Sequence, residues 1–125
     1  MAAKPVMAVE NFFNEYTESR RLFEGLKEVL EQIGPYTLRV SKSQIAICRR
    51  KPFAWAWVPG RYLHGKTAPL VLTVAFPEKE SSPRWKEVVQ VAQERFMHHL
   101  ELYTADDLDD EVASWLQSAW KTSGK

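Results

Sequence analysis

The chain of 125 residues has 45% hydrophobic and 26% charged side chains and a formal net charge of +1. These values fit one folded domain with a single core, and they argue against a disordered protein. The near-neutral total excludes attraction of a partner by overall charge, so any electrostatic function depends on how the charges are distributed.

The sequence has no pattern typical of a membrane or secreted protein. Its most apolar stretch, residues 69–76, is too short to span a bilayer, and we find no signal-peptide pattern. The single cysteine, Cys48, has no internal partner, which favours a reducing compartment. We therefore expect a cytoplasmic protein without a membrane partner.

The first predicted elements are helices. Residues 1–8 show no pattern and are expected to be frayed, so the domain is predicted to span residues 9–121. A short helix is expected near residues 9–16. Apolar side chains then recur at helical spacing from Leu22 to Ile33, and Gly34-Pro35 ends that helix, with the glycine in a left-handed cap.

The middle of the chain changes to the period of a β-strand. Residues 36–40 and 45–48 are predicted to form a hairpin, and residues 53–58 a third strand. Residues 70–76 form an apolar run that is typical of a central strand. For residues 84–94 both a helix, starting near Pro83, and a loop are compatible with the pattern.

The end of the chain is predicted to hold one more strand and one more helix. Residues 96–103 fit the strand, and residues 104–107 resemble a capping box ahead of the helix. The whole is an α+β domain with N-terminal helices, a mostly antiparallel sheet of about five strands and a C-terminal helix. Its predicted core consists of Leu26, Leu30, Ile33, Ile45, Ile47, Trp55, Leu72, Val74, Leu100 and Trp115.

Several stretches in order carry a family resemblance. They are LRVSKSQIAI (38–47), FAWAWVPGRYL (53–63), PLVLTV (69–74), SPRWKEVV (82–89), HHLEL (98–102) and DLDDEVASWL (107–116). With them the chain resembles the bacterial domain of unknown function 5655 family over nearly its whole length. The resemblance implies a short cytoplasmic bacterial protein or a module of a larger one, and it implies no activity, because the family has no assigned function.

The charges are segregated along the chain. Between Glu31 and Glu78 there is no acid, and the bases of this acid-free stretch are Arg39, Lys42, Arg49, Arg50, Lys51, Arg61 and Lys66. Guanidinium and ammonium groups near loops suit phosphate or carboxylate groups. The candidate anion-binding residues are Lys42, Arg49, Arg50, Arg61 and Arg84; the alternative is an ordinary solvated surface.

Aromatic side chains follow one another at period two on the predicted third strand. Phe53, Trp55 and Trp57 are expected to share one face, either as sheet core beneath the helices or as a stacking platform for bases. Tyr62 and Trp85 lie in less regular segments and are expected to be exposed. Trp57, Tyr62 and Trp85 are therefore the stacking candidates.

The double histidine supplies the candidates for catalysis. On a strand, His99 and Glu101 lie on the same face, where such a pair can ligate a metal or act as a base and its orienter. The alternative is one buried histidine and one on a solvated face. The histidines and Cys48 match no zinc-site spacing, so we expect neither metal nor cofactor.

Motifs of common enzyme classes are missing: there is no Gly-rich phosphate loop, nucleophile elbow or dinucleotide fingerprint. The leading hypothesis is a small binding module that holds nucleic acid or a phosphorylated small molecule through a basic, aromatic-bearing sheet edge. The alternative is a small hydrolase-like or metal-assisted enzyme centred on His99 and Glu101. A protein–protein adaptor is a third option, and whether the protein is an enzyme stays open.

Overall fold

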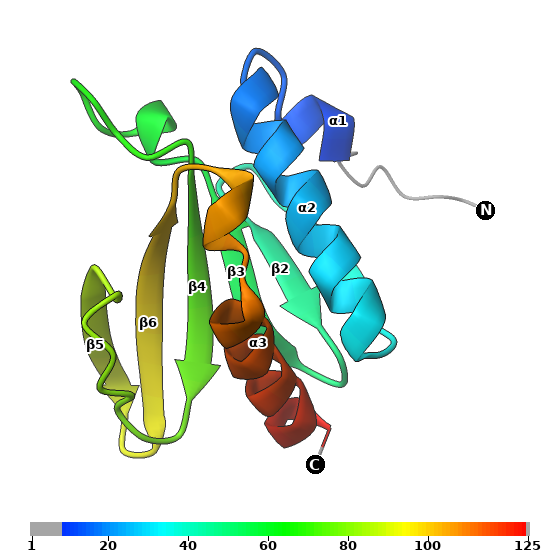
Figure 1. The fold of residues 1–125 in the computed structure, drawn as a ribbon, viewed down its shortest axis with the longest axis vertical. Coiled ribbons are helices and arrows are strands. Elements are labelled where there is room, and N and C mark those ends of the chain that lie inside the picture. The colour runs from blue at the N-terminus through cyan, green and yellow to red at the C-terminus, as the bar shows by residue number, and fades with distance from the viewer. Residues whose placement is uncertain (1–8, 125) are drawn as a thin grey trace.

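The computed structural model describes residues 9–124, which fold as helices packed on one face of a single sheet (Figure 1). The helices are α1 (Val9–Phe12), α2 (Thr17–Ile33) and α3 (Asp110–Ser123), and short 3₁₀ turns are η1 (Pro59–Arg61) and η2 (Ala105–Asp107). The strands are β1 (Thr37–Val40), β2 (Ile45–Cys48), β3 (Pro52–Trp57), β4 (Leu70–Phe76), β5 (Glu87–Ala92) and β6 (Arg95–Leu102). The fraying predicted for residues 1–8 lies outside the described residues.

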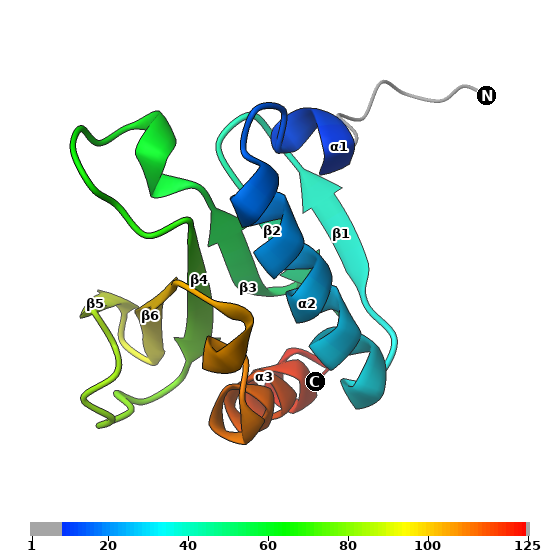
Figure 2. The same ribbon diagram turned by 45° about the horizontal axis from the view of Figure 1, so that its top comes forward.

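The sheet is antiparallel throughout, with the strand order β1-β2-β3-β4-β6-β5. Both long helices, α2 and α3, lie on one side of it, and the opposite side is the open face (Figures 1 and 2). The predicted α+β class is confirmed, with six strands instead of about five. The additional strand is β5.

Neither a helix nor a loop describes residues 84–94 adequately, because most of this segment is β5. Its β-branched residues Val88, Val89 and Val91 favour an extended chain. The strand forms a tight hairpin with β6 in which Glu87 lies opposite His99. The helix predicted from Pro83 is therefore wrong, since pairing with β6 outweighs a weak helical pattern.

Helix α2 follows its predicted stripe, with Leu22, Leu26 and Leu30 buried. The helix ends at Gly34 as predicted, but for another reason. Gly34 has an extended backbone instead of a left-handed cap, and a Cβ at this position would overlap the ring of Trp120 from α3. The glycine is needed because the two helices approach closely there.

The core fills the space between the helices and the sheet. Of the predicted core residues, Leu26, Leu30, Ile45, Ile47, Leu72, Val74, Leu100 and Trp115 are buried. Ile33 is half-buried at the end of α2, and Trp55 is half-buried on the open face. The core positions of β3 are occupied by Ala54 and Ala56.

A bulge explains why the aromatic residues of β3 do not share one face. The register between β2 and β3 shifts at Cys48, which lies opposite Pro52, whereas Ile47 lies opposite Ala54. Phe53 is the extra residue and packs into the helix-side core. Trp55 and Trp57 consequently point to the open face, and the predicted three-aromatic face is wrong.

Candidate functional site

The open face carries the two tryptophans of β3 next to each other. Trp55 lies opposite Thr73 of β4, and Trp57 lies opposite Val71. Both tryptophans are half-buried, whereas Thr73 and Val71 are buried between their neighbours. We call the open-face residues Trp55, Trp57, Thr73 and His99 the tryptophan platform.

A chain of hydrogen bonds runs across three strands of this platform. Trp57 Nε1 donates to Thr73 Oγ1 over 3.2 Å, and Thr73 Oγ1 lies 2.7 Å from His99 Nδ1. The Trp57 and His99 rings also meet edge to face at 6.4 Å between centroids. These contacts hold Trp57 in a fixed orientation.

The same contacts define the state of His99. Thr73 Oγ1 accepts from Trp57, and we assign its O–H as the donor to His99 Nδ1, which puts the ring proton on Nε2. Burial lowers the pKa of His99, although the charge of Glu87 opposes this effect. At neutral pH, His99 is therefore a neutral ring with Nε2–H as its donor.

Glu101 lies on the same face as His99, as predicted, but the two side chains have different partners. Tyr103 donates its hydroxyl to Glu101 over 3.1 Å, and Lys86 Nζ lies 3.4 Å from the Glu101 carboxylate. The hydrogen bond to Glu101 raises the pKa of Tyr103. His99 is bonded to Thr73 instead, so Glu101 does not orient it as a general base.

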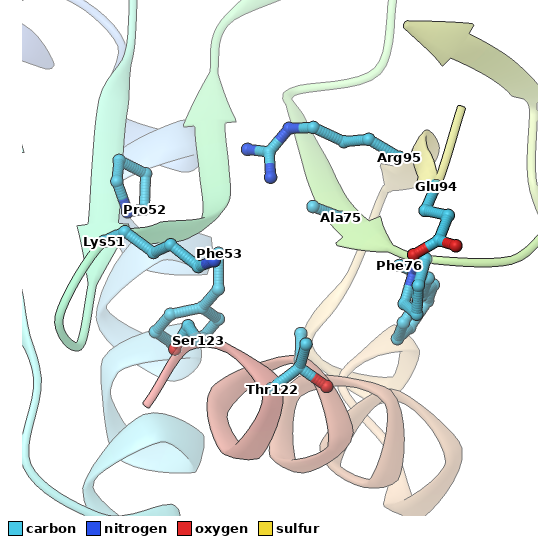
Figure 3. Close-up of a pocket in the computed structure, with 11 residues that line it drawn as sticks. Lys51, Pro52, Phe53, Ala75, Phe76, Glu94, Arg95, Thr122 and Ser123 are labelled. Atoms are coloured by element: carbon cyan, nitrogen blue, oxygen red, sulfur yellow. The ribbon is translucent and has the colours of Figure 1, made fainter. Parts of the chain in front are cut away.

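Arg95 is a cation beside the tryptophan platform that no sequence pattern indicated. It begins β6, and its guanidinium lies 5.8 Å from the Trp55 ring centroid. Figure 3 shows Arg95 reaching across β4 towards β3, beside a small pocket. Lys51, Glu94 and Thr122 also line this pocket, which has a volume of about 100 Å³.

Lys42 and Arg61 meet at one end of the sheet. Arg61 Nη1 donates to the carbonyl of Lys42 over 3.0 Å, and Nη2 donates to the carbonyl of Phe12. The guanidinium also lies over the rings of Phe12 and Tyr16. Arg61 thus ties the β3–β4 connection to the N-terminal helices, while the Lys42 side chain is exposed.

Arg49 and Arg50 lie at the opposite end of the sheet, against the end of α3. Arg49 donates to the carbonyl of Trp120 over 3.2 Å and stacks 3.6 Å from that ring's centroid. Arg50 lies 3.5 Å from the carbonyl of Gly124. Both guanidinium groups interact with the carbonyl end of the helix and keep their positive charge exposed.

Arg84 differs from the other candidate anion-binding residues because carboxylates neutralise it. Its Nη1 lies 3.0 Å from Asp109 and 2.8 Å from Glu111. The hydrogen bond to Glu111 raises the pKa of Arg84, with Asp109 adding to the effect. Asp109 is also the N-cap of α3 and accepts from Val112 N–H. Arg84 therefore fastens the β4–β5 connection to α3.

The stacking candidates are divided between surface and core. Tyr62 is 54% exposed in the β3–β4 connection, as expected. Trp85 is only 8% exposed, because it packs on Trp115 at 4.2 Å between centroids and donates to Glu80. The prediction that Trp85 is exposed is therefore wrong. The tryptophan that lies beside Trp57 on the open face is Trp55.

The acid-free stretch keeps its charges unpaired in the part of the chain that the structure describes. There the ion pairs are Lys27–Glu24, Arg84–Asp109, Arg84–Glu111 and Lys86–Glu101. None involves a base between residues 39 and 66. The helix acids therefore do not neutralise these bases, although Arg49 and Arg61 already donate to backbone carbonyls.

The described residues contain no cluster of side chains that could bind a metal ion. Across residues 9–124, no three His, Cys, Asp or Glu side chains are grouped so that they would hold an ion. Cys48 is free and buried.

Across residues 9–124, no helix is both long and apolar enough to cross a bilayer.

Thr73 in the platform and Arg95 beside it differ in whether the sequence indicated them. Thr73 was detectable in principle, as the polar residue inside the apolar run of residues 70–76. Arg95 was not, because its position depends on the β5–β6 hairpin, which was not predicted.

Taken together, the fold and the platform define a small α+β domain with an open-faced antiparallel sheet. Comparison with protein families matches residues 9–123 to the family described as Domain of unknown function (DUF5655). The chain belongs to this family, and the resemblance inferred from its motifs is confirmed. No curated protein and no solved structure matches the chain.

Proposed function

We propose that the protein is a small binding module that holds single-stranded nucleic acid on the open face of its sheet. The observation that carries the proposal is the position of Trp55 and Trp57, side by side on β3 and opposite the helices. An antiparallel sheet face turned to water is ordinarily polar. Two tryptophans there suit a ligand with flat apolar surfaces, and every nucleobase has such a surface.

Three cations accompany the platform on or beside the open face. Arg95 lies beside Trp55, and Arg39 belongs to the same cross-strand row through Ala46. Lys42 is exposed at one end of the sheet. Stacked bases would lie over the tryptophans while the backbone follows these cations, a combination typical of single-strand binding.

His99 adds a polar contact at the centre of the platform. Its Nε2–H is a donor that no described side chain uses, so it is available to a base carbonyl or a phosphate oxygen. Because the Thr73 contact fixes the ring, this donor is preorganised, which lowers the entropic cost of binding.

The proposed partner carries both phosphate groups and bases. A phosphorylated small molecule has part of this chemistry and is the alternative ligand. The proposal also places the module in the bacterial cytoplasm, for which the family resemblance and the unpaired Cys48 are the support.

A hydrolytic role for His99 and Glu101 is supported less well, because each side chain is engaged with other groups.

A salt-dependent titration tests the electrostatic part of the proposal. A labelled single-stranded oligonucleotide is titrated at low and moderate salt against wild type, Arg39→Glu and Lys42→Glu, with exposed Arg20→Glu on α2 as the control. We expect affinity to fall as salt rises and each platform-side reversal to weaken binding, with Arg20→Glu unchanged.

Competition separates the two kinds of ligand. Unlabelled oligonucleotide is expected to displace the label at concentrations where inorganic phosphate and a mononucleotide do not. Equal displacement by the mononucleotide would favour a phosphorylated small molecule. Absence of binding at low salt, or equal binding by wild type and the charge reversals, would contradict the proposal.

A further inference from the structure

The outer strand β5 presents an edge that no other strand covers, apart from the Gln90 side chain, which donates to the carbonyls of Ala92 and Gln93. It pairs with β6 on one side and ends the sheet on the other (Figure 1). Its side chains are largely exposed, with Val89 at 36% and Val91 at 52%. The free N–H and C=O groups of such an edge are a template for another strand.

The two edges of the sheet differ in their protection against pairing. The opposite edge strand, β1, has four residues, carries Arg39 and lies between Pro35 and the Lys42 turn. Short length, charge and proline are the usual protections of an edge. In contrast, β5 has six residues, contains neither proline nor lysine, and is regular until the bulge after Gln90.

The charges around β5 indicate which chain would pair with it. Its sequence with flanking residues is KEVVQVAQE, residues 86–94. If two copies pair antiparallel about Gln90, Val89 lies opposite Val91, and Lys86 at the start of β5 comes near Glu94 in the β5–β6 turn of the second copy. Opposite charges that approach across an antiparallel pair are favourable, and the two-fold symmetry forms this contact twice.

Both charged residues are exposed enough to make that contact. The Lys86 side chain is 60% exposed, and its pair with Glu101 at 3.4 Å is a surface pair of the kind that contributes little. Glu94 is exposed in the β5–β6 turn. The self-complementary charges and the exposed valines therefore favour a second copy of this chain over an unrelated strand.

We infer that two copies associate through β5, in antiparallel pairing centred on Gln90. The pairing joins the two sheets edge to edge, with a two-fold axis perpendicular to them. Both open faces then lie on the same side, so the dimer presents two tryptophan platforms as one surface. The inference stands on the β5 edge and does not depend on what the platforms bind.

Sedimentation equilibrium over a range of protein concentrations tests this pairing. Wild type is expected to change from the mass of one chain to that of two as concentration rises. Lys86→Glu and Glu94→Lys each place like charges together and should raise the dissociation constant about tenfold or more. The double variant Lys86→Glu/Glu94→Lys restores opposite charges and should recover the wild-type value. Lys66→Glu, in the β3–β4 connection, is the control with the same charge change.

A cysteine trap gives a second readout that does not rely on charge. Gln90→Cys should form a disulfide-linked dimer under mild oxidation, since residues facing each other across an antiparallel pair have the Cα separation that a disulfide needs. Thr37→Cys on β1 should stay monomeric. A wild-type protein with the mass of one chain at all concentrations, or a dimer that the charge changes leave unaltered, would overturn the inference.

Discussion

The hydroxyl of Thr73 lies 2.7 Å from Nδ1 of His99 and also accepts the indole N–H of Trp57. One buried hydroxyl on the central strand β4 therefore fixes a ring on each neighbouring strand. Tryptophans on an uncovered sheet face would otherwise be free to change rotamer. The platform is thus a preorganised surface, which is the property that a binding site requires.

Removal of this hydroxyl tests the structural role of the chain of hydrogen bonds. Thr73→Val keeps the shape of the side chain but leaves Trp57 Nε1 and His99 Nδ1 without their partner. We expect a loss of about 1–3 kcal/mol in the free energy of unfolding, measured by urea denaturation. Thr73→Ser retains the hydroxyl and is the control. Equal stability of the valine and serine variants would show that the contact is not formed.

The buried His98 predicts a pH dependence of stability. Its Nε2 accepts Glu80 N–H over 2.9 Å, and burial lowers its pKa. The unfolded chain therefore takes up a proton at a higher pH than the folded protein does. Stability is fully present above the unfolded pKa of about 6.5 and falls as the pH drops below it.

Urea denaturation between about pH 8 and about pH 5 measures this effect. The slope of the free energy of unfolding against pH is expected to reach at most about 1.4 kcal/mol per pH unit for each histidine involved. His98→Phe removes the titrating group and should flatten the dependence of stability on pH, while His99→Gln tests the contribution of the neighbouring ring. A His98→Phe profile as steep as that of wild type would refute the assignment to His98.

The packing of α2 in the core predicts a large effect of a substitution in its last turn. Leu30 is buried, so Leu30→Ala should lower the free energy of unfolding by about 2–5 kcal/mol. Glu28→Ala, at an exposed position of the same helix, should change it by about 0.5 kcal/mol or less. A loss below about 1 kcal/mol for Leu30→Ala would mean that the stripe does not face the core.

Gly34 predicts a close-packing effect between α2 and α3. An alanine Cβ would overlap the Trp120 ring, which is held by its bond to the Pro35 carbonyl and by Arg49. Gly34→Ala should therefore cost about 1–3 kcal/mol in urea denaturation. Gly60→Ala, where a Cβ meets only an ordinary contact with Thr67, is the control. The second variant Gly34→Ala/Trp120→Leu should recover part of the loss.

Local signals were enough to predict much of this fold. The stripe of α2, the β1–β2 hairpin and the β4 run lie in short segments whose period decides their structure. The Thr104–Asp107 capping box also formed, although it closes η2 and not α3 itself. The burial of Leu30 and Leu72 follows directly from those patterns.

The remaining features depend on contacts between distant residues. The bulge between β2 and β3 places Phe53 and Trp55 on opposite faces of the sheet, and no local sequence pattern predicts this bulge. Trp85 is buried because the β4–β5 connection folds against Trp115 of α3. Arg84 is neutralised by acids more than twenty residues further on. Each of these determines which side chains reach the open face, so the site was less predictable than the fold.

The most direct test of the central claim is the affinity of tryptophan variants for single-stranded oligonucleotide at low salt. Trp55→Ala and Trp57→Ala are compared with wild type and with Trp120→Phe, which lies on the helix side, after circular dichroism shows that each variant is folded. Stacking on the platform predicts that each alanine variant loses about 1–3 kcal/mol of binding free energy, while Trp120→Phe binds as wild type does. Alanine variants that bind as tightly as wild type, or a wild type that does not bind, would contradict it.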